Sequence, residues 1–261
     1  MKIATWNVNS VNVRLEQVLA WLRAHAPDVL CLQELKCETE RFPLAAVQDL
    51  GYSALVAGQK TYNGVALLSR SPGLEPLAGI PGFEDVQQRV IAGTYGDIRV
   101  ISVYCPNGES LASDKYAYKL RWFAALRQYL ASELRRHPRL VVAGDFNVAP
   151  EDRDVYDPVA WKGEVLCSEP ERAAFGALLS EGLKDGFRLF EQAERSYSWW
   201  HYRMNAFKRN MGLRIDHILV SEALGPRCSA CAIDKAPRAA ERPSDHAPVY
   251  AEFSGSSSPS S

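Results

Sequence analysis

The sequence contains no apolar run that approaches the roughly 18 residues a membrane-spanning helix needs. Its six cysteines lack the regular spacing of a disulfide scaffold, and no charged and apolar signal segment precedes the first strand-like residues. We therefore expect a soluble protein of the reducing cytoplasm. Cys228 and Cys231 have a spacing known from redox and metal sites, but no second pair or adjacent histidine completes such a site. We interpret them as structural or incidental.

A large charge of one sign is also missing. The formal net charge of −1 over 261 residues argues against a protein that coats nucleic acid through bulk electrostatics. Local basic stretches do occur, and residues 201–215 carry four cations and no acidic residue: Arg203, Lys208, Arg209 and Arg214. Such a stretch is either a solvated face or a track for a phosphate backbone, and a neighbouring catalytic site would favour the second interpretation.

The composition is that of a globular protein with a core of sufficient size. The chain is 47% hydrophobic and 23% charged, so its stability does not require disulfides or structural metals. No linker or internal repeat divides it, and we predict one domain over residues 1–253. Residues 254–261, rich in Ser, Gly and Pro, are predicted to be a disordered tail.

Apolar periodicity predicts a layered α+β domain. Alternation over residues 1–7 predicts a strand, and the apolar spacing from Val11 to Leu22 predicts a helix that ends before Pro27. Further strands are expected at residues 29–32, 64–69, 89–95, 98–104, 140–143, 213–220 and 248–253, and further helices at residues 115–136 and 171–181. Many strands mixed with helices indicate two sheets packed face to face and covered by helices.

Short polar groups stand at what we expect to be the C-terminal ends of apolar strands. A strand end holds a side chain rigidly while it exposes that side chain to a cleft, and this position suits catalysis. One such group carries little weight, whereas six converging groups indicate a site. They are Asn7, Gln33-Glu34, Tyr104 with Asn107, Asp145 with Asn147, Asp216-His217, and Ser244-Asp245-His246.

These segments, in this order, resemble the exonuclease III and AP endonuclease family of the endonuclease/exonuclease/phosphatase superfamily. The resemblance covers nearly the whole chain. It implies a four-layered α/β sandwich, in which two mainly antiparallel or mixed sheets are flanked by helices, and a metal-dependent phosphodiesterase. The matching segments are Ile3-Ala4-Thr5-Trp6-Asn7, Leu32-Gln33-Glu34-Leu35-Lys36, Gly58-Gln59-Lys60, Gly64-Val65-Ala66, Tyr104-Cys105-Pro106-Asn107-Gly108, Gly144-Asp145-Phe146-Asn147, Gly212-Leu213-Arg214-Ile215-Asp216 and Ser244-Asp245-His246-Ala247-Pro248.

The resemblance also implies roles for these side chains. Phosphodiester hydrolysis requires charge neutralisation on the phosphoryl oxygens, an in-line water and stabilisation of a departing oxyanion. Glu34 is our first choice as the Mg²⁺ ligand, and Mn²⁺ is expected to substitute. The expected surroundings of the metal are Asn7, Glu34, Asp145, Asn147, Asp245 and His246, with Asp245 either a second ligand or a residue that orients its neighbours.

The expected catalytic residues are Tyr104, Asp145, Asn147, Asp216 and His246. Asp145 accepts a proton from the attacking water, and Asn147, on the same side if the chain stays extended, positions that water. His246, with Asp216 as its carboxylate partner, contacts a phosphoryl oxygen, as does the hydroxyl of Tyr104. His217 is expected to point to the opposite face of its strand.

Aromatic and basic residues near position 200 indicate a DNA substrate, because they combine flat stacking surfaces with cations. The resemblance implies that Trp199, Leu213 and Ile215 form a small apolar pocket for a base-less sugar and that Arg203 inserts at the lesion. Asn107 is expected to hold its loop against the substrate. Packing in the core is the alternative interpretation of Trp199. Asn9 departs from the family pattern, because some relatives have an aspartate there.

We thus predict a Mg²⁺-dependent DNA-repair nuclease that acts at abasic sites and blocked 3′ ends, with 3′→5′ exonuclease activity on duplex DNA. Its expected partner is double-stranded DNA, with no membrane and no obligate protein partner. Two alternatives remain open: a phosphatase of the same superfamily, and a non-enzymatic nucleic-acid-binding regulator on the same scaffold. The intact set of polar residues argues against the regulator, and the aromatic and basic segment argues against the phosphatase.

Overall fold

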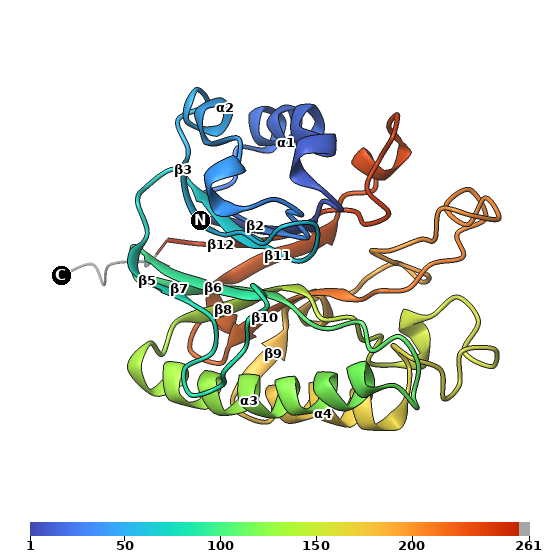
Figure 1. Ribbon diagram of the computed structural model, residues 1–261. Coiled ribbons are helices and arrows are strands. Elements are labelled where there is room, and N and C mark those ends of the chain that lie inside the picture. The colour runs from blue at the N-terminus through green and yellow to red at the C-terminus, as the bar shows by residue number, and fades with distance from the viewer. Residues whose placement is uncertain (256–261) are drawn as a thin grey trace.

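Two six-stranded sheets packed face to face form the middle of the molecule in the computed structural model, which describes residues 1–255 (Figure 1). Helices cover the outer face of each sheet, which gives four layers. The four-layered α/β sandwich with mixed sheets is therefore confirmed. Residues 256–261 of the predicted tail lie outside the described residues.

The first sheet has the strand order β11-β12-β1-β2-β4-β3. Its central strands, β1 and β2, run parallel, and the other neighbouring pairs are antiparallel. Every residue of β2 is buried, as expected for a strand covered on both faces. The bounds are β1 Lys2–Asn7, β2 Val29–Gln33, β3 Ser53–Ala57, β4 Val65–Ser69, β11 Cys228–Ile233 and β12 Val249–Phe253.

The second sheet has the order β5-β6-β7-β8-β10-β9. Here β7 and β8 are the parallel pair, and β10 runs antiparallel to β8 with Asp216 opposite Asp145. The bounds are β5 Leu74–Ala78, β6 Val90–Tyr95, β7 Ile98–Tyr104, β8 Leu140–Asp145, β9 Leu183–Asp185 and β10 Asp216–Ser221.

Helices α1 (Val11–His25) and α2 (Leu44–Gln48) cover the first sheet, and α3 (Asp114–Arg136) and α4 (Glu169–Leu179) cover the second (Figure 1). One apolar cluster fills the space between the sheets, and each helical layer adds a second cluster. Short 3₁₀ turns occupy Thr39–Arg41, Asp152–Asp154, Gly186–Leu189, Gly225–Arg227 and Pro237–Ala239. Within residues 1–255, no helix has the length and apolarity that a membrane crossing demands.

Two of the polar groups lie at the opposite end of their strand from the end that we expected. The predicted strand at 213–220 begins only at Asp216, and the segment 244–246 precedes β12. Asp216 and His246 therefore lie at the N-terminal ends of their strands, and the prediction of C-terminal ends was wrong for both. They still reach the same edge, because β10 is antiparallel to β8 and β12 is antiparallel to β1.

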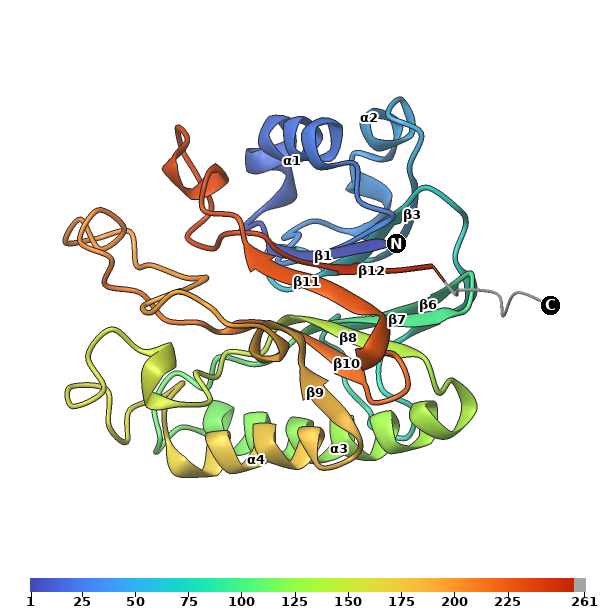
Figure 2. The same cartoon turned by 180° about the vertical axis from the view of Figure 1, so that it is seen from behind.

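The long loops gather at this same edge. Figure 2, which shows the molecule from behind, places the loops that follow β8 and β9 and precede β12 around one end of the sandwich, away from the chain's C-terminus. The end of a rigid double sheet thus carries the polar residues, and loops surround it.

Candidate active site

Asn7, the last residue of β1, links the two sheets at their loop end. Its fully buried Nδ2 donates hydrogen bonds to Glu34 Oε1 and to Asp145 Oδ2, both at 2.9 Å. Glu34 directly follows β2 in the first sheet, and Asp145 ends β8 in the second. One amide group therefore holds together two carboxylates that come from opposite sheets.

A histidine and a second aspartate extend this group. His246 Nδ1 lies 2.9 Å from Asp216 Oδ2, and its Nε2 lies 3.8 Å from Asp145 Oδ2. The hydroxyl of Ser198 donates to the same Asp216 oxygen at 2.7 Å. The carboxylate of Asp216 thus sets the orientation of the imidazole ring, whose other nitrogen faces Asp145.

The pKa values of this buried pair shift in ways that suit proton transfer. Burial disfavours a charge on His246, but Asp216 and Asp145 outweigh burial and raise its pKa above the usual range. Burial also raises the pKa of Asp145, and Asp216 adds to that effect, while the charge of His246 opposes it. Asp145 is thereby a stronger proton acceptor than an exposed aspartate.

Glu34 keeps its charge despite its surroundings. Burial opposes ionisation, but Lys36 and Asn7 outweigh it and hold the pKa of Glu34 below its usual value. Lys36 Nζ lies 2.9 Å from Glu34 Oε2. The hydroxyl of Tyr104 donates to Glu34 Oε1 at 2.9 Å, and burial together with the charge of Glu34 raises the pKa of Tyr104 well above 10, so the phenol stays protonated.

One group of side chains in the described part of the chain has the geometry of a metal site. Ligand atoms of Glu34, Asp145 and His246 lie within 4.8 Å of one another. The two carboxylates, with Asn7 adjoining, suit a divalent cation that prefers oxygen ligands, and the imidazole of His246 lies beside them. All six cysteines are free thiols, and none joins this group.

Asn147 does not continue the extended chain of β8. Its φ of 50° is in the left-handed region, so the condition of an extended chain is not met, yet its side-chain Nδ2 still lies 3.4 Å from Asp145 Oδ2. The turn instead brings the Asn147 N–H to Asp145 Oδ1 at 2.9 Å. Its side-chain Nδ2 donates to Cys105 O, and its Oδ1 accepts from Asn107 Nδ2 at 3.2 Å.

Asp245 precedes His246, but its carboxylate binds Asn9 and Trp199 and not Glu34 or Asp145. Its Oδ1 accepts from Asn9 Nδ2 at 2.9 Å, and its Oδ2 accepts from Trp199 Nε1 at 3.0 Å. Asn9 Oδ1 in turn accepts from Lys36. Both carboxylate oxygens of Asp245 are thus engaged with neighbours, an arrangement that fits the orienting alternative better than direct ligation.

The residues expected to contact substrate are placed unequally. Arg203 is exposed, and Trp199 is partly buried next to His246, with which it forms an isolated β-bridge. Leu213 and Ile215, however, are fully buried in a cluster with Ala149, Val155, Leu166 and Cys167, so they offer no surface to a sugar in this structure. Trp200 is a core residue with no exposed surface.

A groove of about 940 Å³ adjoins the site at Tyr104 and Asn107. Its lining includes Tyr104 and Asn107 together with polar side chains such as Asn63, Gln87 and Arg89. Arg89 also places its guanidinium 4.8 Å from the centre of the Tyr104 ring and donates to the Tyr104 carbonyl. The groove therefore gives access to Tyr104 and Asn107 from the surface.

Sequence reasoning missed two kinds of residue. Lys36 contacts Glu34, and Ser198 contacts Asp216, but neither was predicted as a site residue. Lys36 lies within one of the matching family segments, and Ser198 does not. Arg214 belongs to the basic stretch that we interpreted as either a solvated face or a phosphate track, but it is buried and pairs with Asp154 and Asp185, so neither interpretation holds for it. His217 lies on the opposite face of β10 from Asp216, as expected, in contact with Arg214 and Val148 O.

The chain is similar to known proteins over nearly its whole length. Residues 4–246 match the model of the Endonuclease/Exonuclease/phosphatase family. The exodeoxyribonuclease III of Haemophilus influenzae is 39% identical over 97% of this chain and 100% of that protein.

Solved structures are similar over the same length. The "3'-5' exonuclease (NExo)" of Neisseria meningitidis has a TM-score of 0.96 and 51% identity over 98% of this chain and 100% of that one. An AP endonuclease of Archaeoglobus fulgidus has a TM-score of 0.94 and 38% identity over the same shares. The chain therefore belongs to the exonuclease III and AP endonuclease family of metal-dependent phosphodiesterases, within the endonuclease/exonuclease/phosphatase superfamily.

Proposed function

We propose that this protein is a Mg²⁺-dependent DNA-repair nuclease that removes blocking groups from 3′ ends, incises abasic sites and degrades duplex DNA from its 3′ ends. The group formed by Glu34, Asp145 and His246 carries the proposal, because it joins a charged carboxylate, a proton acceptor and a cationic imidazole within 4.8 Å. Double-stranded DNA is the proposed partner.

Glu34 would hold the cation, with Asn7 and Asp145 adjoining it. A bound divalent metal supplies Lewis-acid stabilisation of charge on the phosphoryl oxygens. Mg²⁺ is proposed because it usually takes one or two protein carboxylates and keeps several waters, and Mn²⁺ accepts a similar oxygen-rich geometry.

The chain's own groups divide the remaining work. Asp145 accepts the proton of the attacking water, since its raised pKa makes it a competent base, and the Asn147 N–H fixes its carboxylate. His246, kept cationic by Asp216, stabilises developing charge on the phosphoryl group. Tyr104 and Asn107, which line the groove, would donate hydrogen bonds to the substrate phosphate.

Within this activity, 3′ ends are the substrates that the site accommodates most directly. Leu213 and Ile215, expected as walls of a sugar pocket, are covered by Leu166 and its neighbours. The Neisseria relative is described as a 3′-5′ exonuclease and a 3′ phosphatase, and the Archaeoglobus relative as an AP endonuclease. Abasic-site incision then requires that the cluster around Leu213 open toward the substrate.

One incubation tests the proposal. A 3′-phosphate duplex, an abasic-site duplex and an intact recessed duplex are each incubated with the protein in Mg²⁺ or in EDTA, and products are resolved on a denaturing gel. We expect Mg²⁺-dependent processing, fastest on the 3′-phosphate duplex, and none by the His246→Ala variant purified in parallel. If none of the DNAs is processed in Mg²⁺, the proposal fails, and turnover of an inositol phosphate in its place would indicate a phosphatase.

A further inference from the structure

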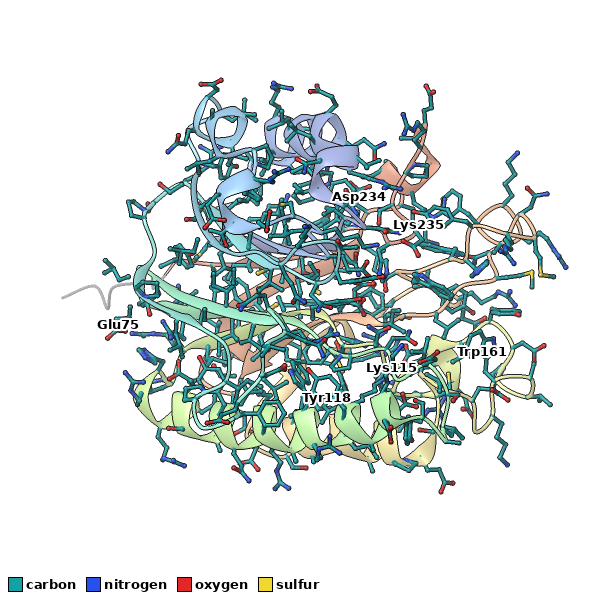
Figure 3. All side chains as sticks on the ribbon, viewed as in Figure 1. Glu75, Lys115, Tyr118, Trp161, Asp234 and Lys235 are labelled. Atoms are coloured by element: carbon teal, nitrogen blue, oxygen red, sulfur yellow. The ribbon has the colours of Figure 1, made fainter. Side chains whose placement is uncertain are left out.

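Lys119 is a charged residue with no exposed surface, one turn into α3. Figure 3 labels Lys115 and Tyr118, which mark the first turns of this helix near the loop end of the sandwich. An ammonium group has three N–H donors. Those of Lys119 have three acceptors: the carbonyl oxygens of Asn107 at 3.1 Å and Asn147 at 2.6 Å, and Glu171 Oε1 at 2.5 Å.

Glu171 is equally buried, and the start of α4 fixes it. Its Oε1 also accepts from the Leu166 N–H at 3.0 Å, and its Oε2 accepts from the N–H and the hydroxyl of Ser168. Ser168 and Glu171 form the capping box of α4. The carboxylate that holds Lys119 is therefore anchored to a helix end, and it is not free to follow the loops if they move.

The two carbonyl groups that Lys119 binds belong to neighbouring residues of the proposed active site. Asn107 follows β7, Asn147 follows β8, and Asn107 Nδ2 donates to Asn147 Oδ1. The Asn147 peptide is in the left-handed region and also holds Asp145 Oδ1 through its N–H. A shift of the Asn147 carbonyl would thus move the residue whose N–H fixes the carboxylate of Asp145, and a shift of Asn107 would disturb the hydrogen bond that holds the Asn147 side chain.

We propose that Lys119 is a positioning residue for the hydrolytic step, held by Glu171, which fixes the loops of Asn107 and Asn147 relative to each other. This inference rests on the proposed function. Lys119 acts from beneath the site and contacts no substrate. A buried ion pair is weak evidence for stability alone, because desolvation offsets much of its attraction. Its two hydrogen bonds to catalytic loops supply the functional reason for the charge.

The test compares Lys119→Met with a matched control, Arg99→Met. Arg99 and Glu133 form an ion pair of 2.7 Å in which each side chain is 2% exposed. Arg99 also donates to the carbonyl of Glu75, which Figure 3 labels at the opposite end of the molecule. Single-turnover rates and binding constants are measured on the 3′-phosphate duplex, at a temperature well below the Tm of both variants.

We expect both variants to lose thermal stability and only Lys119→Met to lose rate. Misplacement of a reacting group by about 1 Å can cost on the order of 100-fold, so a loss of about 10- to 100-fold is expected at nearly unchanged DNA affinity. Arg99→Met should stay within about two-fold of the wild type. Equal rates for Lys119→Met and Arg99→Met, or a loss confined to DNA affinity, would overturn the inference.

A double variant separates positioning from stability. Lys119→Met with Glu171→Gln leaves no unpaired buried charge and keeps an acceptor for Ser168, so its Tm should recover toward the wild type. Its rate should stay as low as that of Lys119→Met, because the two carbonyls remain unbound. Recovery of the rate together with the Tm would show a merely structural role. A wild-type protein that processes none of the DNAs would instead remove the proposed function, and this inference with it.

Discussion

Replacement of Asp216 by Asn should slow hydrolysis and shift the alkaline limb of its pH–rate profile to lower pH. The change removes the charge 2.9 Å from His246 Nδ1 and keeps an oxygen that can accept the imidazole N–H. Burial then opposes the imidazolium with less compensation, because Asp216 is the first of the groups that raise the pKa of His246. The pKa of His246 should therefore fall.

The magnitude follows from the strength of this contact. Hydrogen bonds to charged groups contribute about 1.5–3 kcal/mol and neutral ones about 0.5–1.5 kcal/mol, so loss of the charge alone should cost about 1–1.5 kcal/mol, or roughly 5- to 13-fold in rate. In the wild type the raised pKa keeps His246 cationic to a higher pH than an exposed histidine. The rate of hydrolysis should therefore stay high as the pH rises. In the variant the alkaline limb should begin at lower pH.

The assay is a single-turnover rate on a 3′-phosphate duplex, measured from about pH 6 to about pH 10 with saturating Mg²⁺. Asp185→Asn is the matched control, because Asp185 is also buried and charged but pairs with Arg214 and does not contact His246. It should leave the profile unchanged. The reasoning is refuted if Asp216→Asn keeps both the wild-type rate and the wild-type alkaline limb.

Three further predictions address the metal, the substrate and the acid stability. Glu34→Gln should chiefly raise the Mg²⁺ concentration needed for half-maximal rate, and an unchanged metal titration would reject Glu34 as the ligand. Trp199→Ala should reduce abasic-site cleavage more than 3′-phosphate removal, while equal losses would leave Trp199 a packing residue. Burial and Arg214 lower the pKa of His217 to about 4, so its contribution to stability is present above the unfolded pKa of about 6.5 and is lost as the pH falls toward 4. Between about pH 7.5 and about pH 5, the free energy of unfolding measured in urea should fall by about 2 kcal/mol more for the wild type than for His217→Gln. Equal decreases would contradict this.

Strands with clear apolar periodicity could be predicted from the sequence, and weakly patterned edge strands could not. β1 and β2 are buried central strands whose side chains leave a strong pattern. β5, at a sheet edge, is mostly exposed, and β11, also at an edge, consists largely of small half-buried residues. An edge strand is defined by its backbone pairing, and its side chains carry little of that information.

The candidate site could be predicted as a set of residues but not as a geometry. The motifs around Asn7 and Glu34 lie at strand ends, and parallel pairing of β1 with β2 brings them together. The left-handed turns at Glu34 and Asn147 were not predictable, since non-glycine residues adopt this conformation rarely. Tertiary contacts impose them.

Buried charges were the largest gap. Arg214 occurs in a basic stretch that we interpreted as a solvated face or a phosphate track, and Lys119 in the predicted helix 115–136, yet both are fully buried beside acidic partners. Their partners, Glu171 and Asp154, are 52 and 60 residues away in sequence. Only the packing of α3 against α4, and of the segment before β10 against the loop after β8, reveals such pairs.

The central claim is that Asp145 activates the water that attacks the phosphodiester. The most direct test is the single-turnover rate of Asp145→Asn on a 3′-phosphate duplex in Mg²⁺, measured together with the affinity for the same DNA. The variant keeps the size of the side chain and removes the proton acceptor, so we predict loss of most of the turnover with DNA binding largely intact. A variant that retains a near-normal single-turnover rate would contradict the account.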